Sequence, residues 1–307
     1  MSEPLPKILV IAGPTGSGKG ELARHLAVKL GGELISADSR KIYRGLDIGT
    51  AKPTVAMRRL VAYHLIDVCS PAERFSAARF CSMARAVIVD IRARGKVPIV
   101  VGGTGLYVRA ALYGLIDVPR TNELVRSRLE AEENQEPGCL FRRLLEVDPD
   151  AAARLRPGDR LRITRALEVY ELTGRPMTLV QREHGFAQRT FRAWQVAPRW
   201  PRAELYRRIN ERIDRMLDAG WLEEVKRLRH EGLSAAPALR VVGYRELNSY
   251  LDGERPWDET YAVIQRAHRR YARRQLTWFK TVPELNWWDA PVDIDTLTAS
   301  AREFLNL

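Results

Sequence analysis

The chain of 307 residues lacks the features of a membrane protein and of a disulfide-stabilised one. No apolar run approaches the roughly 20 residues of a membrane span, and the segment before Lys7 lacks the apolar stretch of a signal peptide. The three cysteines, Cys69, Cys81 and Cys139, have no paired spacing, so neither a disulfide framework nor a zinc site is indicated. We therefore expect a cytoplasmic protein without a membrane partner.

Lysine is also scarce. Only 8 of the 50 basic residues are lysine, yet the formal net charge is +12. A basic chain favours a polyanionic partner, because neutralising phosphates releases counterions. Arginine enrichment in a GC-rich genome would give the same composition without such a partner, so charge alone does not assign one.

Apolar runs alternate with helical patterns over the first part of the chain, up to about residue 115. The apolar runs are Ile8–Ala12, Leu34–Ala37, His64–Val68 and Val97–Val101, and the helical patterns include Gly18–Leu30 and Ser76–Arg94. This alternation predicts an α/β fold, a P-loop NTPase-like parallel sheet flanked by helices, with ligands at the carboxyl ends of the strands. Three polar loops follow those ends, and we expect them to meet in one crevice: Gly13–Lys19, Asp38–Tyr43 and Gly102–Thr104.

The strand pattern disappears between about Asn122 and Arg182 and returns in one run, Phe191–Val196. Long helical patterns follow at Arg202–Leu217, Leu222–His230, Leu239–Leu251 and Trp257–Lys280, and Trp287-Trp288 indicates a terminal strand. The prediction is a catalytic core of residues 1–121 and 191–307 with an all-helical insertion of residues 122–190.

A glycine-rich loop follows the first strand and opens a helix, the arrangement that encloses a phosphate with backbone N–H groups. The candidate diphosphate-binding residues are Gly13, Pro14, Thr15, Gly16, Ser17, Gly18, Lys19 and Gly20. Gly20 stands where a Ser or Thr hydroxyl usually reaches Mg²⁺. The ligands of any Mg²⁺ therefore stay unassigned, with Thr15, Ser17, Asp38 and Thr104 as candidates.

Asp38 directly follows the second strand, where a carboxylate beside a diphosphate could take a proton or hold a metal. An ordinary turn or helix-cap role is the alternative, since Asp is common where strands end.

The stretch from Asp38 to Pro53, DSRKIYRGLDIGTAKP, resembles the signature of the tRNA dimethylallyltransferases, also called tRNA isopentenyltransferases. Further matches follow in family order: Val101–Tyr107, Arg162–Glu168, Val242–Arg245 and Arg273–Phe279. The resemblance covers nearly the whole chain, from about Lys7 to Asp289. The long signature is specific, whereas the phosphate loop alone would fit many nucleoside kinases.

The resemblance implies transfer of the dimethylallyl group from dimethylallyl diphosphate to the exocyclic amine of the adenosine 3′-adjacent to the anticodon. The tRNAs would read codons that begin with U, and the enzyme would be a Mg²⁺-dependent monomer. Asp38 would accept the proton of the amine, and Thr104 would be a second polar contact unless it only caps the helix after it. One arginine would contact the diphosphate; Arg208 and Arg212 both match, and we favour Arg208, with a solvated helix face as the alternative.

The resemblance also implies that residues of four segments contact the anticodon arm. Arg126 is a weaker candidate for the same role. The residues are Asp38, Ser39, Arg40, Lys41, Leu161, Arg162, Ile163, Thr164, Arg165, Arg240, Val241, Val242, Gly243, Tyr244, Arg245, Arg273, Arg274, Gln275, Leu276, Thr277, Trp278, Phe279 and Lys280. Arginines recur at helical spacing from Arg266 to Arg274, which suits a polyanion-binding face but is also common on solvated helices.

Three rival functions remain. A small-molecule phosphotransferase would share the loop, although Gly20 removes the usual Mg²⁺ hydroxyl. Prenylation of free adenine nucleotides is disfavoured by the basic insertion and C-terminal helix. An RNA-binding module without catalysis would explain Gly20 as a lesion.

Overall fold

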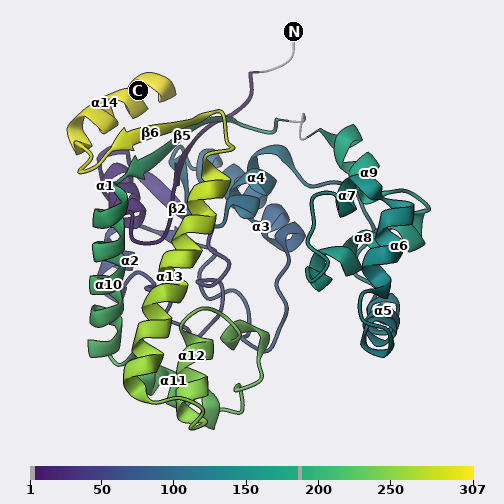
Figure 1. Ribbon diagram of the computed structural model, residues 1–307. Helices are drawn as coiled ribbons and strands as arrows, with labels where there is room; N and C mark the ends of the chain where they lie inside the picture. Colours follow the sequence, from purple (N-terminus) through teal and green to yellow (C-terminus); the bar gives the residue numbers. More distant parts are fainter. Residues whose placement is uncertain (1–3, 186–188) are drawn as a thin grey trace. The chain divides into compact units, whose positions relative to one another are not determined.

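The computed structural model describes residues 4–185 and 189–307 (Figure 1). The chain divides into two compact units, one of Met1–Leu112 and Thr190–Leu307 and the other of Tyr113–Arg189. The insertion was predicted to begin at residue 122, nine residues after the start of the smaller unit at Tyr113. Residues 114–122 form no helix or strand, so the sequence has no periodic pattern that marks where the chain leaves the larger unit.

A six-stranded, all-parallel sheet forms the centre of the larger unit, in the order β3-β2-β4-β1-β5-β6. Its strands are β1 (Lys7–Ala12), β2 (Gly32–Ser36), β3 (Tyr63–His64), β4 (Val97–Gly102), β5 (Arg192–Arg199) and β6 (Leu285–Asp289). Ile8 to Ile11 are fully buried, as expected of a central parallel strand with helices on both faces. The predicted parallel sheet flanked by helices is confirmed.

One predicted strand is mostly wrong. His64–Val68 contributes only His64 to β3, and Leu65 and Asp67 adopt positive φ angles that end the strand. Asp67 instead accepts ion pairs from Lys52 and Arg58. An apolar pattern in the sequence does not reveal this turn, because its cause is a set of contacts to residues earlier in the chain.

Helices cover both faces of the sheet. In the larger unit they are α1 (Lys19–Leu30), α2 (Val55–Leu60), α3 (Ala77–Ala93), α4 (Gly105–Tyr113), α10 (Arg202–Asp218), α11 (Trp221–His230), α12 (Tyr244–Leu251), α13 (Trp257–Phe279) and α14 (Ile294–Leu305). One buried cluster joins β1, β2 and β4 to α1 and α14, whereas α3 packs against β2 and β4.

A second buried cluster joins α10 to α13 with the segment after β2. In Figure 1, α10 and α13 run side by side, with α11 and α12 at their ends away from the sheet. The helix predicted over Leu239–Leu251 is broken: a 3₁₀ turn over Pro237–Leu239 precedes α12, and Gly243 between them has a φ of 90°. That left-handed value suits glycine and explains the break.

The smaller unit holds only helices among its described residues: α5 (Glu123–Gln135), α6 (Cys139–Val147), α7 (Pro149–Ala152), α8 (Arg160–Thr173) and α9 (Met177–His184). They enclose their own apolar cluster, with Leu129, Leu144 and Leu167 fully buried. None of the helices within residues 4–185 and 189–307 combines the length and apolar character needed to cross a membrane.

Candidate active site

The glycine-rich loop lies between β1 and α1. Gly18 begins α1 with a φ of 83°, and no side chain caps this helix start. The loop is held tightly, since the Ser17 amide donates to the Pro14 carbonyl at 3.3 Å and the Lys19 ammonium donates to the same oxygen at 3.1 Å. An uncapped helix N-terminus with a lysine beside it is suited to bind an anion such as a diphosphate.

Two side chains hold the backbone carbonyls of this loop. Arg208 of α10 donates from Nε to the Gly16 carbonyl at 3.1 Å, and the Trp200 indole N–H donates to the Ser17 carbonyl at 3.0 Å. The Arg208 guanidinium lies over the Trp200 ring, 4.4 Å from its centroid. Part of the role of Arg208, the favoured arginine, is therefore to brace the loop from outside.

Arg212, the other candidate arginine, lies one helical turn further along α10. Its guanidinium donates to the Thr15 hydroxyl at 3.2 Å. Burial lowers the pKa of Arg212, whereas the nearby Asp38 carboxylate raises it. Both arginines thus reach the loop, but it is Arg212 that lies beside Asp38.

Asp38 follows β2 and forms a turn with its own backbone. Its Oδ1 atom accepts the amides of Arg40 at 2.9 Å and Lys41 at 3.4 Å, so the turn role considered from the sequence is present. Among the described residues, no hydrogen bond reaches Oδ2. One oxygen of the carboxylate is therefore fixed by the backbone and the other is available to a substrate.

Two lysines share the electrostatic environment of Asp38. Burial and, less strongly, the adjacent Arg212 lower the pKa of Lys19 to about 7, although Asp38 opposes this shift. Burial likewise lowers the pKa of Lys41 to about 8, again opposed by Asp38. Three cationic groups thus surround a single carboxylate, so the site has an excess of positive charge. A bound diphosphate would supply the missing negative charge.

Thr104 connects the loop after β4 to the turn at Asp38. Its hydroxyl accepts the Ser39 amide at 3.0 Å and lies 3.4 Å from the Ser39 hydroxyl. Thr104 also directly precedes α4, where its backbone carbonyl, and not its hydroxyl, accepts the Tyr107 and Val108 amides, so it begins the helix without a side-chain cap.

The sheet order brings the three polar loops together, because β4 lies between β2 and β1. The Thr104 amide donates to the Ala37 carbonyl at 3.2 Å, which joins the second loop to the third. Gln275 of α13 joins the third to the first: it accepts the Thr15 amide at 2.8 Å and donates to the Gly103 carbonyl at 2.7 Å. The expectation that the three loops meet is confirmed by these contacts.

A metal ion would find few protein ligands here. The described residues contain no cluster of three or more His, Cys, Asp or Glu side chains. The Thr15 and Thr104 hydroxyls are engaged, and the buried Ser17 hydroxyl lacks a hydrogen-bond partner among the described residues. Asp38 Oδ2, which accepts no hydrogen bond from a described residue, is a carboxylate oxygen that could bind a metal ion. Because Mg²⁺ usually keeps several waters and binds one or two carboxylates with substrate phosphates, this donor set fits a substrate-held Mg²⁺.

The residues predicted to contact tRNA fall into exposed and buried groups. The side chains of Leu161, Arg162, Arg240, Arg245, Arg273, Arg274, Thr277 and Lys280 are exposed, whereas those of Ile163, Thr164, Tyr244, Gln275 and Phe279, together with Gly243, are buried. Arg126 and Arg165 both pair with Glu168, which is fully buried in the smaller unit. The buried residues of this set pack inside the protein and hold the segments on which the exposed residues lie.

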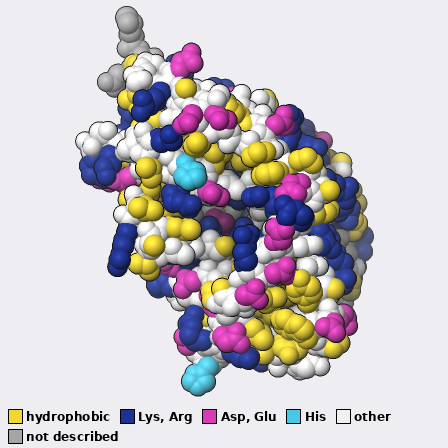
Figure 2. Space-filling model, turned by 90° about the vertical axis from the view of Figure 1, so that its left-hand side faces the viewer, with side chains coloured by type: hydrophobic (Ala, Val, Ile, Leu, Met, Phe, Trp, Pro, Cys, Tyr) yellow, Lys and Arg dark blue, Asp and Glu magenta, His cyan; other side chains and the backbone are white. Residues whose placement is uncertain are grey.

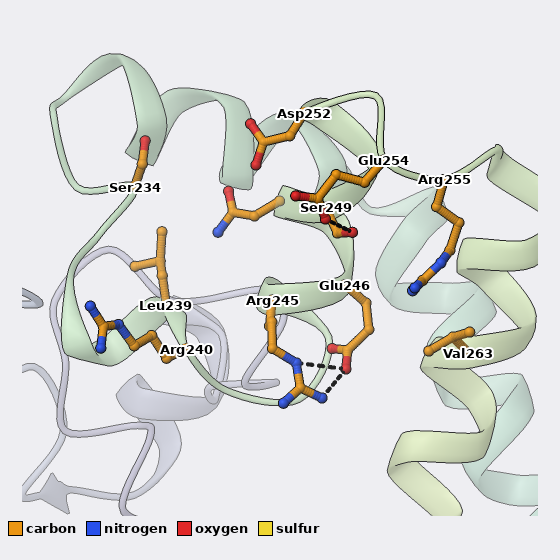
Figure 3. Close-up of a pocket in the computed structure, with 11 residues that line it drawn as sticks. Ser234, Leu239, Arg240, Arg245, Glu246, Ser249, Asp252, Glu254, Arg255 and Val263 are labelled. Carbon is orange, nitrogen blue, oxygen red and sulfur yellow. Dashed lines mark hydrogen bonds and ion pairs between the residues drawn. The ribbon is translucent and has the colours of Figure 1, made fainter. Parts of the chain in front are cut away.

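A cavity of about 540 Å³ lies along the segment that carries Arg240 and Arg245 (Figure 3). Arg245 pairs with Glu246 in this view, and the exposed Arg240 makes no ion pair with any described residue. On the face drawn in Figure 2, Lys and Arg side chains are spread out with Asp and Glu side chains between them. On that face, the basic side chains therefore form no single continuous patch.

The sequence did not reveal two residues that organise the site. Glu224 of α11, only 6% exposed, accepts the amides of Asp47, Ile48 and Gly49 and the hydroxyl of Tyr244. Lys52 donates to the Tyr43 carbonyl and pairs with Asp47 and Asp67. Their spacing in sequence gives no sign of these contacts, although Lys52 lies within the signature stretch.

Comparison with known proteins identifies the family. Residues 41–282 match the model of the IPP transferase family. The chain is 49% identical over 296 residues to tRNA dimethylallyltransferase 1 of Pelobacter propionicus, covering 95% of this chain and 96% of the relative. It is 47% identical over 300 residues to tRNA dimethylallyltransferase 1 of Citrifermentans bemidjiense, covering 97% of each.

Solved structures agree. The full-length tRNA isopentenylpyrophosphate transferase of Bacillus halodurans is 38% identical, with a TM-score of 0.72 over 98% of this chain and 95% of that one. A eukaryotic dimethylallyltransferase acting on tRNA is 28% identical, with a TM-score of 0.82 over 97% of this chain and 77% of that one. This chain belongs to the IPP transferase family, the family of the tRNA dimethylallyltransferases.

Proposed function

We propose that this chain transfers the dimethylallyl group of dimethylallyl diphosphate to the exocyclic amine of the adenosine 3′-adjacent to the anticodon. The products would be N6-dimethylallyladenosine and diphosphate, in tRNAs that read codons beginning with U. The observation that supports the proposal is the joining of three strand ends, where the Asp38 carboxylate and Lys19 of the glycine-rich loop share one electrostatic environment. A nucleophile and a leaving group need this kind of shared site.

The diphosphate side of the site would stabilise the leaving group. As the allylic C–O bond loosens, negative charge builds on the diphosphate, and fixed N–H dipoles and cations lower the barrier. The loop amides would supply the N–H dipoles, and Lys19 and Arg212 would supply the positive charge. Arg208 holds the loop in place through the Gly16 carbonyl. Arg212 therefore joins Arg208 as a proposed catalytic arginine.

Asp38 would act on the nucleophile. The lone pair of an exocyclic amine is delocalised into the adenine ring, so an acceptor that orients the N–H group and takes its proton is needed. The N–C bond to the allyl carbon forms as the C–O bond to diphosphate breaks, and the amine proton passes to Asp38 Oδ2. Thr104, bonded to the Ser39 amide, would hold this turn and offer a second polar contact.

We propose Mg²⁺ as the cofactor, which the diphosphate of the substrate and the Asp38 carboxylate would hold. When bound, it would neutralise part of the diphosphate charge. The three cationic side chains of the site share that task, which makes the missing hydroxyl at Gly20 tolerable.

The anticodon arm would be bound by exposed arginines of two separate regions. Leu161 and Arg162 lie in the first turn of α8 in the smaller unit, and Arg273 and Arg274 lie on α13 in the larger one. An adenine that leaves its stack is stabilised by arginine and aromatic side chains, which these segments contain. We also expect the protein to work as a monomer in the cytoplasm, where its tRNA substrate is found.

One assay tests the function directly. Purified protein is mixed with unmodified tRNA carrying an adenosine after the anticodon and with labelled dimethylallyl diphosphate, with and without Mg²⁺. Label should appear on intact tRNA. Tight tRNA binding without any transfer would indicate a binding module, and ATP consumption without tRNA would indicate a phosphotransferase.

A further inference from the structure

Gln275 is the side chain that touches both loops of the diphosphate side. It lies on α13, is 7% exposed, and its two amide atoms are both used: Oε1 accepts the Thr15 N–H at 2.8 Å and Nε2 donates to the Gly103 carbonyl at 2.7 Å. The two loops follow adjacent strands, β1 and β4, and Gln275 is more than 170 residues away from either in sequence.

The fit around this side chain is close. A β-carbon on Gly103 would overlap Gln275 Nε2 and approach the Gly13 carbonyl, and one on Gly105 would overlap the Trp278 indole. Gln275 and Trp278, about one helical turn apart, therefore pack directly on the Gly102–Gly105 turn. A shift of α13 along this contact would move both loops.

The outer side of the same helix is free for a ligand. Arg270 and Arg273 are exposed, and neither makes a hydrogen bond or ion pair with any residue among 4–185 and 189–307. One helix thus carries a face that holds the reaction loops and a face that presents unpaired guanidinium groups.

We propose that Gln275 is a positioning residue, not a tRNA contact, and that it couples tRNA binding on α13 to the shape of the diphosphate loop. This inference rests on the proposed transfer reaction. Binding of tRNA to the outer face restricts α13, and the Gln275 amide passes that restriction to Thr15 and Gly103. The diphosphate then binds to loops that are already ordered, so each substrate should strengthen the binding of the other.

The test uses Gln275→Met, which keeps the length of the side chain and removes both hydrogen bonds, and Gln275→Glu, which keeps the acceptor for Thr15. Gln265→Met, on the same helix but away from the loops, is the matched control. Affinity for a non-reactive thiolo analogue of dimethylallyl diphosphate is measured with and without tRNA, alongside kcat, KM for each substrate, tRNA Kd and Tm.

In the wild type, tRNA should tighten analogue binding about fivefold or more. Gln275→Met should abolish that gain, raise KM for dimethylallyl diphosphate and lower kcat about 10- to 100-fold, with tRNA Kd little changed. Gln275→Glu should retain part of the gain, and Gln265→Met should behave as the wild type. The Tm values identify a variant that has unfolded, in which case Gln275→Glu carries the test.

Two results would overturn the inference: no gain in analogue affinity from tRNA in the wild type, or a Gln275→Met variant that loses tRNA affinity but keeps kcat and KM for the diphosphate. Neither touches the proposed function as long as the wild type transfers label to tRNA. A wild type without transfer would instead refute the proposed function itself.

Discussion

At the scale of single residues, the site depends on a balance of charge around Asp38. Lys19, Lys41 and Arg212 lie close enough to feel its carboxylate, yet burial still lowers the pKa of all three cations. The site without substrate is therefore short of negative charge. A diphosphate would restore the balance and favour the protonated lysines.

This balance predicts a pH dependence of substrate binding. A lysine with a pKa of about 7 loses its proton as the pH rises through that value, and Lys41 follows near 8. Affinity for dimethylallyl diphosphate should therefore fall between about pH 7 and pH 9, and binding at pH 8 should take up protons. Calorimetry in two buffers of different ionisation enthalpy measures that uptake.

Lys19→Met serves as the matched variant, because it removes the group with the lowest lysine pKa while leaving Lys41. It should bind more weakly at pH 7 and show a smaller proton uptake at pH 8. An affinity for the diphosphate that is flat from pH 6 to pH 9 in the wild type would refute the charge balance.

At the scale of elements, periodic patterns predicted most of the fold. Helices such as α1, α3 and α10 were predicted to within a residue or so, because each buries one face of a regular pattern. The failures at His64–Val68 and Leu239–Leu251 have another cause. There, the backbone follows turns set by distant partners and by Gly243, which a local pattern does not contain.

The same limit applies to the site. Gly13–Lys19, Asp38 and Thr104 are visible in sequence because each follows a strand end. Glu224 was not singled out, and Gln275 was predicted only as a tRNA contact, because the contacts that both side chains make to the loops span more than 170 residues of chain. Some of the residues predicted from the resemblance as tRNA contacts, such as Tyr244, are buried in the structure, which the sequence pattern does not indicate.

Glu224 should stabilise the signature stretch, Asp38 to Pro53, through its contacts to the backbone there. Glu224→Gln places an amide donor among three backbone donors, and leaving those partly buried groups unsatisfied should lower the free energy of unfolding by about 1–3 kcal/mol. Urea denaturation measures the change. Glu223→Gln, an exposed neighbour on the same helix, should change it by less than about 0.5 kcal/mol. Equal effects of the two substitutions would contradict this role for Glu224.

The exposed face of α13 should set the salt dependence of tRNA binding. If Arg273 contacts one phosphate, Arg273→Ala should reduce the slope of log K against log salt by about one. Arg199→Ala is the control, because Arg199 is exposed but paired with Asp289. Filter binding across a salt series measures both slopes, and an unchanged slope for Arg273→Ala would mean that this arginine faces only solvent.

At the scale of the whole molecule, the two units have separate apolar cores. The larger unit carries the sheet and the three polar loops, and the described part of the smaller one packs its helices around Leu129, Leu144 and Leu167. Arg126 and Arg165 stabilise that smaller unit through Glu168. We propose that its exposed Leu161 and Arg162, on α8, contact the tRNA.

The central claim is that the Asp38 carboxylate accepts the amine proton beside the diphosphate loop, and single-turnover kinetics of Asp38→Asn test it most directly. With tRNA and dimethylallyl diphosphate bound beforehand, the substitution keeps the size of the side chain and removes its basicity. The rate of transfer should fall by about 10²–10⁴-fold while tRNA affinity changes little. A rate equal to that of the wild type, or a loss confined to tRNA binding, would contradict the account.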